Sequence, residues 1–143
     1  MKLEEVEELW SKDVQIDRTA LDEESLKIPY LHAKYYKLYL REKITLKAEQ
    51  NTYSEFFKTK HEYYTGKLSN SECKTLGWEP FQFVLKGDIH VYLDADKEIC
   101  AKLIKLQVQR EKVDFLENII KTLNTRGFLI KNAIEFRKFA NGG

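Results

Sequence analysis

The apolar residues between positions 26 and 64 follow the spacing of a helix with two apolar sides. Leu26, Ala33 and Leu40 recur at intervals of seven residues, which places them on one side. Because an apolar face is stable only when it is covered, the pattern favours packing against the rest of the chain and against a neighbouring subunit. The second apolar side consists of Ile28, Tyr35, Tyr39 and Leu46.

A second long helix is predicted from Asp94 or Asp96 to about Asn124, with apolar residues in heptads. Gly127 is expected to end it, because glycine adopts positive φ without a Cβ penalty, and a final helix follows. The pattern fits an intramolecular bundle or self-assembly, and the short remaining chain favours self-assembly. The residues predicted to mediate oligomerisation are Ile99, Leu106, Val113, Leu116, Ile120 and Leu123.

The segment between these helices breaks the helical pattern. Glycines and Pro80 indicate a loop after residue 67. Apolar and polar residues then alternate on either side of Lys86-Gly87-Asp88, which suggests a short β-hairpin over residues 81–93.

These elements predict a mainly α fold in three parts. Residues 1–67 form a helical unit, and residues 68–93 form the linker with the suggested hairpin. Residues 94–143 form a helical oligomerisation unit, whose long helix has the pattern of a coiled coil.

Charge is distributed unevenly, although the net charge is only +1. Residues 1–26 carry three cations and nine acids, whereas residues 27–67 carry nine cations and four acids. On the helix of residues 26–64, Lys34, Lys37 and Arg41 fall within one arc. This basic stripe is either a solvated face or a contact for phosphates.

Cations and aromatic rings share one surface in the stretch 56–67. Lysine ammonium groups neutralise phosphates, and aromatic rings take unstacked bases at roughly 1–3 kcal/mol per base. Such a surface binds single strands without reading their sequence. The alternative is that the rings are core and the lysines a solvated face. At helical spacing, one side of this stretch consists of Phe56, Lys60, Tyr63 and Lys67. The adjoining side consists of Phe57, His61 and Tyr64.

Catalytic and metal-binding patterns are absent from the sequence. Gly66-Lys67 lacks the other residues of a phosphate-binding P-loop, and the three histidines have no companion at ligand spacing. Cys73 and Cys100 are isolated and fit reduced thiols in a reducing compartment. With an acidic N-terminus and no apolar run long enough for a membrane span, the chain is expected to be a cytosolic non-enzyme without metal or cofactor.

Four blocks of the sequence resemble the UvsY family, the recombination mediator proteins of T-even-type bacteriophages. The signature at 58–66, Lys-Thr-Lys-His-Glu-Tyr-Tyr-Thr-Gly, is similar to the family's Lys-Ala-Arg-Leu-Asp-Tyr-Tyr-Ser-Gly. Ala95-Asp96-Lys97 resembles the family's Ala-Asp-Lys before its C-terminal helix. The remaining blocks are Leu3-Glu4, Lys12-Asp13-Val14 and Ile16-Asp17 near one end, and Arg126-Gly127-Phe128, Ile130-Lys131 and Arg137 near the other.

The resemblance implies a ring of six or seven subunits in the cytoplasm of the bacterial host. It implies that the ring-forming oligomer binds single-stranded DNA, with residues 1–67 as the DNA-binding unit. It also implies contacts with the phage recombinase and the phage single-stranded-DNA-binding protein, and a role in promoting recombinase loading without catalysis. Lys58 and Lys60 would be the principal phosphate contacts; Lys60 replaces an arginine and His61 a leucine of the family pattern. The residues predicted to bind nucleic acid are Lys34, Lys37, Arg41, Lys58, Lys60, His61, Tyr63, Tyr64 and Lys67.

A second hypothesis belongs to a different class. Two-sided helices also suit a coiled-coil scaffold or adaptor that does not bind nucleic acid, with the acidic N-terminal segment docking a basic partner. The two hypotheses differ in one observable, because only a mediator binds oligothymidine with an affinity that falls steeply as salt rises.

Overall fold

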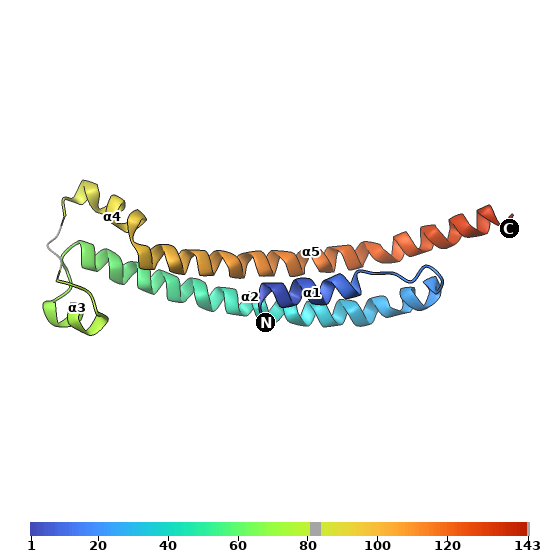
Figure 1. Ribbon diagram of the computed structural model, residues 1–143, viewed down its shortest axis with the longest axis horizontal. Helices are drawn as coiled ribbons and strands as arrows, with labels where there is room; N and C mark the ends of the chain where they lie inside the picture. The colour runs from blue at the N-terminus through green and yellow to red at the C-terminus, as the bar shows by residue number, and fades with distance from the viewer. Residues whose placement is uncertain (81–83, 143) are drawn as a thin grey trace. The chain divides into compact units, whose positions relative to one another are not determined.

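The fold is built almost entirely from helices. A computed structural model describes residues 1–80 and 84–142, and these residues contain no strand. The predicted mainly α fold is therefore confirmed (Figure 1). The elements are α1 (Leu3–Asp13), α2 (Leu21–Tyr64), α3 (Asn70–Leu76), the 3₁₀ helix η1 (Lys86–Asp88), α4 (Ile89–Ala95) and α5 (Lys97–Ala140).

The chain forms two compact units, and both long helices contribute to each of them. Unit 1 combines Met1–Thr45 with Val108–Gly143, and unit 2 is Leu46–Gln107. Unit 1 thus contains α1, the first half of α2 and most of α5, whereas unit 2 contains the end of α2, the short helices and the start of α5. The division predicted from the sequence, at residues 67 and 93, stays a prediction.

Helix α2 contains Pro29 within its length. Proline lacks the amide hydrogen needed for the intrahelical bond, so it normally weakens a helix interior. Here the helix continues because buried residues hold it on both sides of the proline, with Leu21 before it and Leu31 and Tyr35 after it. Acidic residues in the first turn also favour the helix N-terminus.

The core of unit 1 lies where α1, α2 and α5 pack together. Val6 from α1 and Tyr35 from α2 are fully buried against Leu116 and Leu123 from α5. The ring of Trp10 packs edge-on against Tyr35, with centroids 5.4 Å apart. Each buried side chain of this size contributes about 1.5–3 kcal/mol, so the short helix α1 packs stably against the two long helices.

Buried polar groups tie the end of α1 to the other two helices. The Asp13 carboxylate accepts hydrogen bonds from Lys34 Nζ and from the Tyr35 hydroxyl, each at 2.7 Å. The Arg126 guanidinium of α5 donates to the backbone carbonyls of Asp13 at 3.0 Å and Val14 at 2.6 Å. Because the last carbonyls of a helix have no intrahelical donor, Arg126 stabilises the end of α1.

The prediction that Gly127 ends the C-terminal helix was wrong. α5 continues through this position to Ala140. A glycine in a helix interior costs only about 1 kcal/mol. Flanking residues that are buried, Arg126 and Ile130, hold the backbone in place, so this cost is readily offset. A Cβ at Gly127 would lie 3.9 Å from Ile28 Cδ1, so the helices approach each other at this residue.

The suggested hairpin over 81–93 was also wrong where the structure describes it. Residues 81–83 lie outside the described residues. The residues predicted as the turn, Lys86–Asp88, form the 3₁₀ helix η1. The residues predicted as the second strand belong to α4. Ile89 and Leu93 are four residues apart, and this spacing fits one side of a helix as well as one face of a strand. The helix is favoured because Leu93 is buried in it.

The heptad residues of α5 face their own chain. Ile99 and Leu106 are buried in unit 2, and Val113, Leu116 and Leu123 are buried in unit 1. Ile120 is partly buried and packs against the unit 1 core. Their predicted role in oligomerisation stays a prediction, and the large apolar side chains that α5 exposes are Leu103, Ile104, Val108, Phe128, Leu129, Phe136 and Phe139.

Candidate nucleic-acid interface

Three of the four aromatic residues in the stretch 56–67 are packed inside unit 2, whereas the fourth, Phe57, is 37% exposed. Tyr63 is buried, donates its hydroxyl hydrogen to the backbone carbonyl of Glu79 at 2.7 Å and lies with its ring 5.1 Å from Trp78. Phe56 meets the same tryptophan edge-on at 6.1 Å. Tyr64 contacts the ring of Tyr92 at 5.8 Å. These rings join the end of α2 to the segment that follows α3.

Lys60 lies in the middle of this aromatic cluster and is only 4% exposed. Its Nζ is 3.0 Å from Asp96 Oδ2 and 3.3 Å from Glu98 Oε1. It also lies 4.1 Å from the centroid of the Trp78 ring, a cation–π contact that is favourable in a water-poor site. Two carboxylates and an aromatic face therefore already surround the lysine that sequence reasoning assigned to phosphate.

Asp96 organises the same site from the start of α5. It accepts the Ile99 amide at 2.9 Å, which makes it the N-cap of α5, and the Tyr64 hydroxyl at 2.6 Å. Burial opposes ionisation of Asp96, but the hydrogen bonds from Tyr64, the Ile99 amide and Lys60 outweigh it and lower the pKa below 3.8. Burial and the bond to Asp96 in turn raise the pKa of Tyr64 above its usual range.

Sequence reasoning missed the carboxylate partners of Lys60. The signal that could have found one of them was present, since Ala95-Asp96-Lys97 was recognised as a block ahead of a helix. Its position predicted an N-cap, and an N-cap aspartate keeps one oxygen available for a second partner. Periodicity within α2 carried no information about where α5 begins.

Three basic residues of the stretch 56–67 are exposed: Lys58, His61 and Lys67. They lie on or just after the last turns of α2, beside the buried Lys60. No ion pair within residues 1–80 and 84–142 uses any of the three side chains. The signature thus separates into buried residues that hold the fold and exposed cations available to an anionic ligand.

The basic stripe predicted on α2 belongs to unit 1. Lys34 is partly buried and paired with Asp13 at 2.7 Å, whereas Lys37 and Arg41 are exposed. Burial opposes ionisation of Asp13, and the bonds from Lys34 and Tyr35 outweigh it, so the pKa of Asp13 is lowered. Lys34 therefore has a structural partner, and Lys37 and Arg41 are the exposed members of the stripe.

In the part of the chain that the structure describes, no group of three or more His, Cys, Asp or Glu side chains could hold a metal ion. No described helix is long and apolar enough to cross a membrane. Cys73 is buried and Cys100 is exposed, and both are free thiols.

Comparison with known proteins gives consistent results. Residues 9–143 match the family model described as recombination, repair and single-stranded-DNA-binding protein UvsY. The recombination protein uvsY of Enterobacteria phage T4 is 27% identical over 145 residues, covering 99% of each chain. Crystal structures of the bacteriophage T4 recombination mediator protein UvsY are also similar. One has a TM-score of 0.84 at 26% identity over 99% of both chains, and a second has 0.83 at 25% identity over 97% of this chain and 99% of the other.

Proposed function

The chain belongs to the UvsY family of recombination, repair and single-stranded-DNA-binding proteins, and on this premise we propose that it is a recombination mediator that binds single-stranded DNA as an oligomer. In this role it helps to load the phage recombinase onto DNA covered by the phage single-stranded-DNA-binding protein. The protein acts by binding and displacement in the cytoplasm of the bacterial host, without catalysing a reaction.

The observation that carries the proposal is the exposure of Lys58, His61 and Lys67 beside a rigid aromatic cluster. Lys58 and Lys67 have no carboxylate partner within the described residues, so these lysines are free to neutralise phosphates and release counterions. In the same proposal Lys60 supports binding by holding the cluster together, since its ammonium group is already paired with Asp96. Tyr63 and Tyr64 likewise fix the end of α2, and Lys37 and Arg41 of unit 1 add phosphate contacts.

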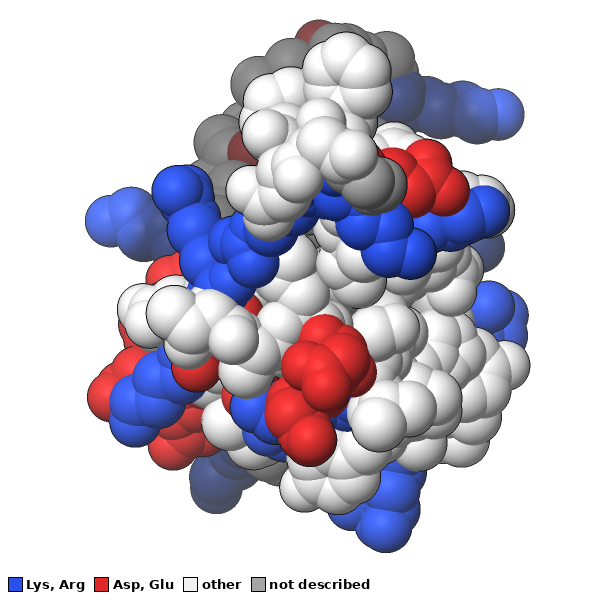
Figure 2. All heavy atoms as spheres, turned by 90° about the vertical axis from the view of Figure 1, so that its right-hand side faces the viewer, with Lys and Arg blue, Asp and Glu red and all other residues white. Residues whose placement is uncertain are grey.

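Assembly of several subunits follows from the apolar surface that the single chain leaves exposed. Phe128, Leu129, Phe136 and Phe139 at the end of α5 are each at least 60% exposed. Figure 2 looks toward the end of the molecule where α5 finishes, and residues without charge cover much of that face between groups of basic and acidic residues. Exposed apolar area of this kind favours contact with another protomer, here in a hexamer or heptamer.

Oligomeric binding explains how a mediator can hold a strand tightly and still release it. Each subunit contributes a few salt-sensitive phosphate contacts, and linking them in one assembly raises the effective concentration of every further contact. The strand can then leave one subunit at a time. Release in steps gives a recombinase access to DNA that the single-stranded-DNA-binding protein would otherwise cover.

Fluorescence anisotropy of labelled oligothymidine across a salt series tests the proposal. The wild type is compared with Lys58→Ala/Lys67→Ala and with a control, Lys74→Ala/Lys131→Ala, which removes the same charge from two other exposed lysines. The first pair should weaken binding and reduce the slope of log affinity against log salt by about 1.4, since each lost contact to a single strand removes about 0.7. The control should keep the wild-type slope.

The mass of the assembly, measured by light scattering on the same samples, completes the test. An intact oligomer that does not bind oligothymidine at low salt would contradict the mediator hypothesis and favour the scaffold hypothesis. Equal losses for both double variants would show that binding depends only on net charge and not on the end of α2.

A further inference from the structure

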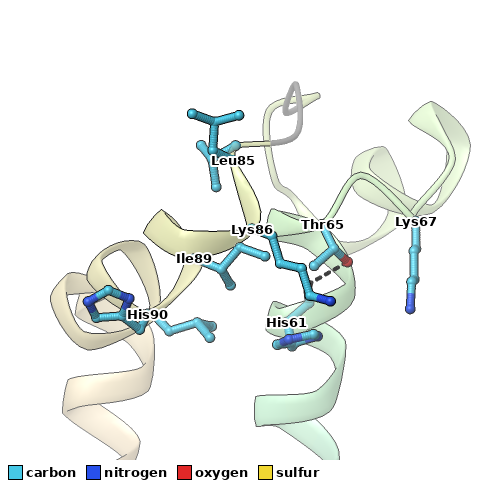
Figure 3. Close-up of a pocket in the computed structure, with 9 residues that line it drawn as sticks. His61, Thr65, Lys67, Leu85, Lys86, Ile89 and His90 are labelled. Carbon is cyan, nitrogen blue, oxygen red and sulfur yellow. Dashed lines mark hydrogen bonds between the residues drawn. The ribbon is translucent and has the colours of Figure 1, made fainter.

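A pocket opens in unit 2 between the end of α2 and the η1–α4 segment. Its volume is about 650 Å³. On the α2 side His61 and Thr65 line it, four residues apart on the same face of the helix. On the opposite side Lys86 and Ile89 point toward them (Figure 3). The pocket therefore lies directly beside the exposed cations assigned above to DNA.

Basic and apolar groups make up the pocket, and none of its described lining residues is acidic. Four basic side chains line it: His61 and Lys67 at the end of α2, and Lys86 and His90 on the other side. None of these four forms an ion pair within the described residues. The apolar part of the lining consists of Val84, Leu85, Ile89 and Leu93.

This combination suits a ligand that has an anionic group and a flat, weakly polar body. A phosphate prefers lysines that have no carboxylate partner. An unstacked base needs an apolar wall or a ring, and a histidine imidazole can provide the ring. The volume falls within the range typical of pockets for small ligands and exceeds what a phosphate alone requires.

We propose that this pocket holds one nucleotide of the bound strand, with Lys67 and Lys86 on its phosphates and Ile89 and His61 against its base. The proposal rests on the proposed function and extends it to Lys86 and Ile89, which sequence reasoning had placed in a hairpin. It also gives the short segment η1–α4 a role, because the helical conformation brings Lys86 and Ile89 to the same side.

The first experiment compares Lys86→Gln with Lys74→Gln. Both lysines are exposed residues of unit 2, and Lys74 lies outside the pocket lining. Lys86→Gln should reduce the salt slope for oligothymidine by about 0.7, the value for one phosphate contact. Lys74→Gln should leave it unchanged. Identical slopes for the wild type and both variants would overturn the assignment of Lys86 even if binding itself is normal.

A second experiment tests the base contact. An abasic oligomer keeps the phosphates but removes the bases, so the wild type should bind it at least about fivefold more weakly than oligothymidine if one base is engaged. Ile89→Ser should narrow that difference, and the affinity for the abasic strand should stay the same. Equal binding of both strands by the wild type would overturn the base contact.

Crosslinking separates failure of the pocket from failure of the proposed function. Oligothymidine carrying 5-iododeoxyuridine should crosslink on irradiation to the peptide containing His90 or to that containing His61. Crosslinks confined to other peptides, with affinity unchanged, would contradict the nucleotide pocket but not the proposed mediator function. A protein that does not bind the strand at low salt would contradict both proposals. Thymidine monophosphate should compete weakly; displacement of the strand at equal nucleotide concentration would indicate a free-nucleotide site instead.

Discussion

Lys60 Nζ and Asp96 Oδ2 lie 3.0 Å apart, and each side chain is only 5% exposed. The pair joins the last turns of α2 to the N-cap of α5 within unit 2. Because a buried charge is costly without its partner, each residue needs the other more than either would at the surface. This relationship changes the role expected for a lysine in a basic signature from ligand contact to support.

Replacing Lys60 by methionine should lower the free energy of unfolding by about 3–5 kcal/mol, because the Asp96 carboxylate would stay buried without its cation. Urea unfolding followed by circular dichroism at fixed protein concentration measures this loss. Lys60→Arg, which restores the family residue, should lose much less. Lys58→Met, at an exposed position two residues away, should change stability by less than about 0.5 kcal/mol. If Lys60→Met left the free energy of unfolding unchanged, the supporting role would be refuted.

The stability of unit 2 should fall in acid because the pKa of Asp96 is lowered in the folded protein. A lowered pKa means that the unfolded chain takes up the proton first, so the contribution is fully present above the ordinary value of 3.8 and is lost as the pH falls below it. Urea midpoints measured between about pH 5 and pH 2 should show the decline. Asp96→Asn should flatten it, and an unchanged pH profile in that variant would contradict the assignment.

Arg126→Met should detach the end of α1 from α5. The guanidinium donates to three successive carbonyls, those of Asp13, Val14 and Gln15, and a methionine of similar length donates to none. We expect a loss of about 1.5–3 kcal/mol, since the part-buried acceptors would lose a charged donor. Hydrogen exchange should show faster exchange in α1. Arg137→Met, on the exposed part of α5, is the matched control and should leave both measurements unchanged.

Gly127→Ala should stabilise the protein by about 0.5–1 kcal/mol, because alanine favours the helix interior and the new Cβ would make an ordinary contact with Ile28. Gly77→Ala provides the opposite case. Gly77 has a φ of 77° at the C-cap of α3, a conformation that costs an L-residue roughly 1 kcal/mol or more. Thermal melts of the two variants should shift in opposite directions, and a destabilised Gly127→Ala would indicate that the contact with Ile28 cannot adjust.

The sequence by itself determined the two long helices and the family. Seven-residue recurrence predicted two long helices because apolar spacing along a helix is a local property of the chain. Their existence and the mainly α fold are confirmed, and so is the resemblance found in the blocks around Lys58 and Arg126. The separation between basic and acidic segments was equally readable, since charge needs no tertiary contact to be counted.

Tertiary structure alone decided what covers each face and which cations are exposed. The spacing of Lys60 reads the same whether its partner is a phosphate or the distant Asp96, and only the fold brings that carboxylate within 3.0 Å. The same reason explains why the predicted helix end at Gly127 and the predicted strand after Gly87 were wrong. Their local signals for a helix end and a hairpin are worth about 1 kcal/mol, and burial of Ile130 and Leu93 outweighs them.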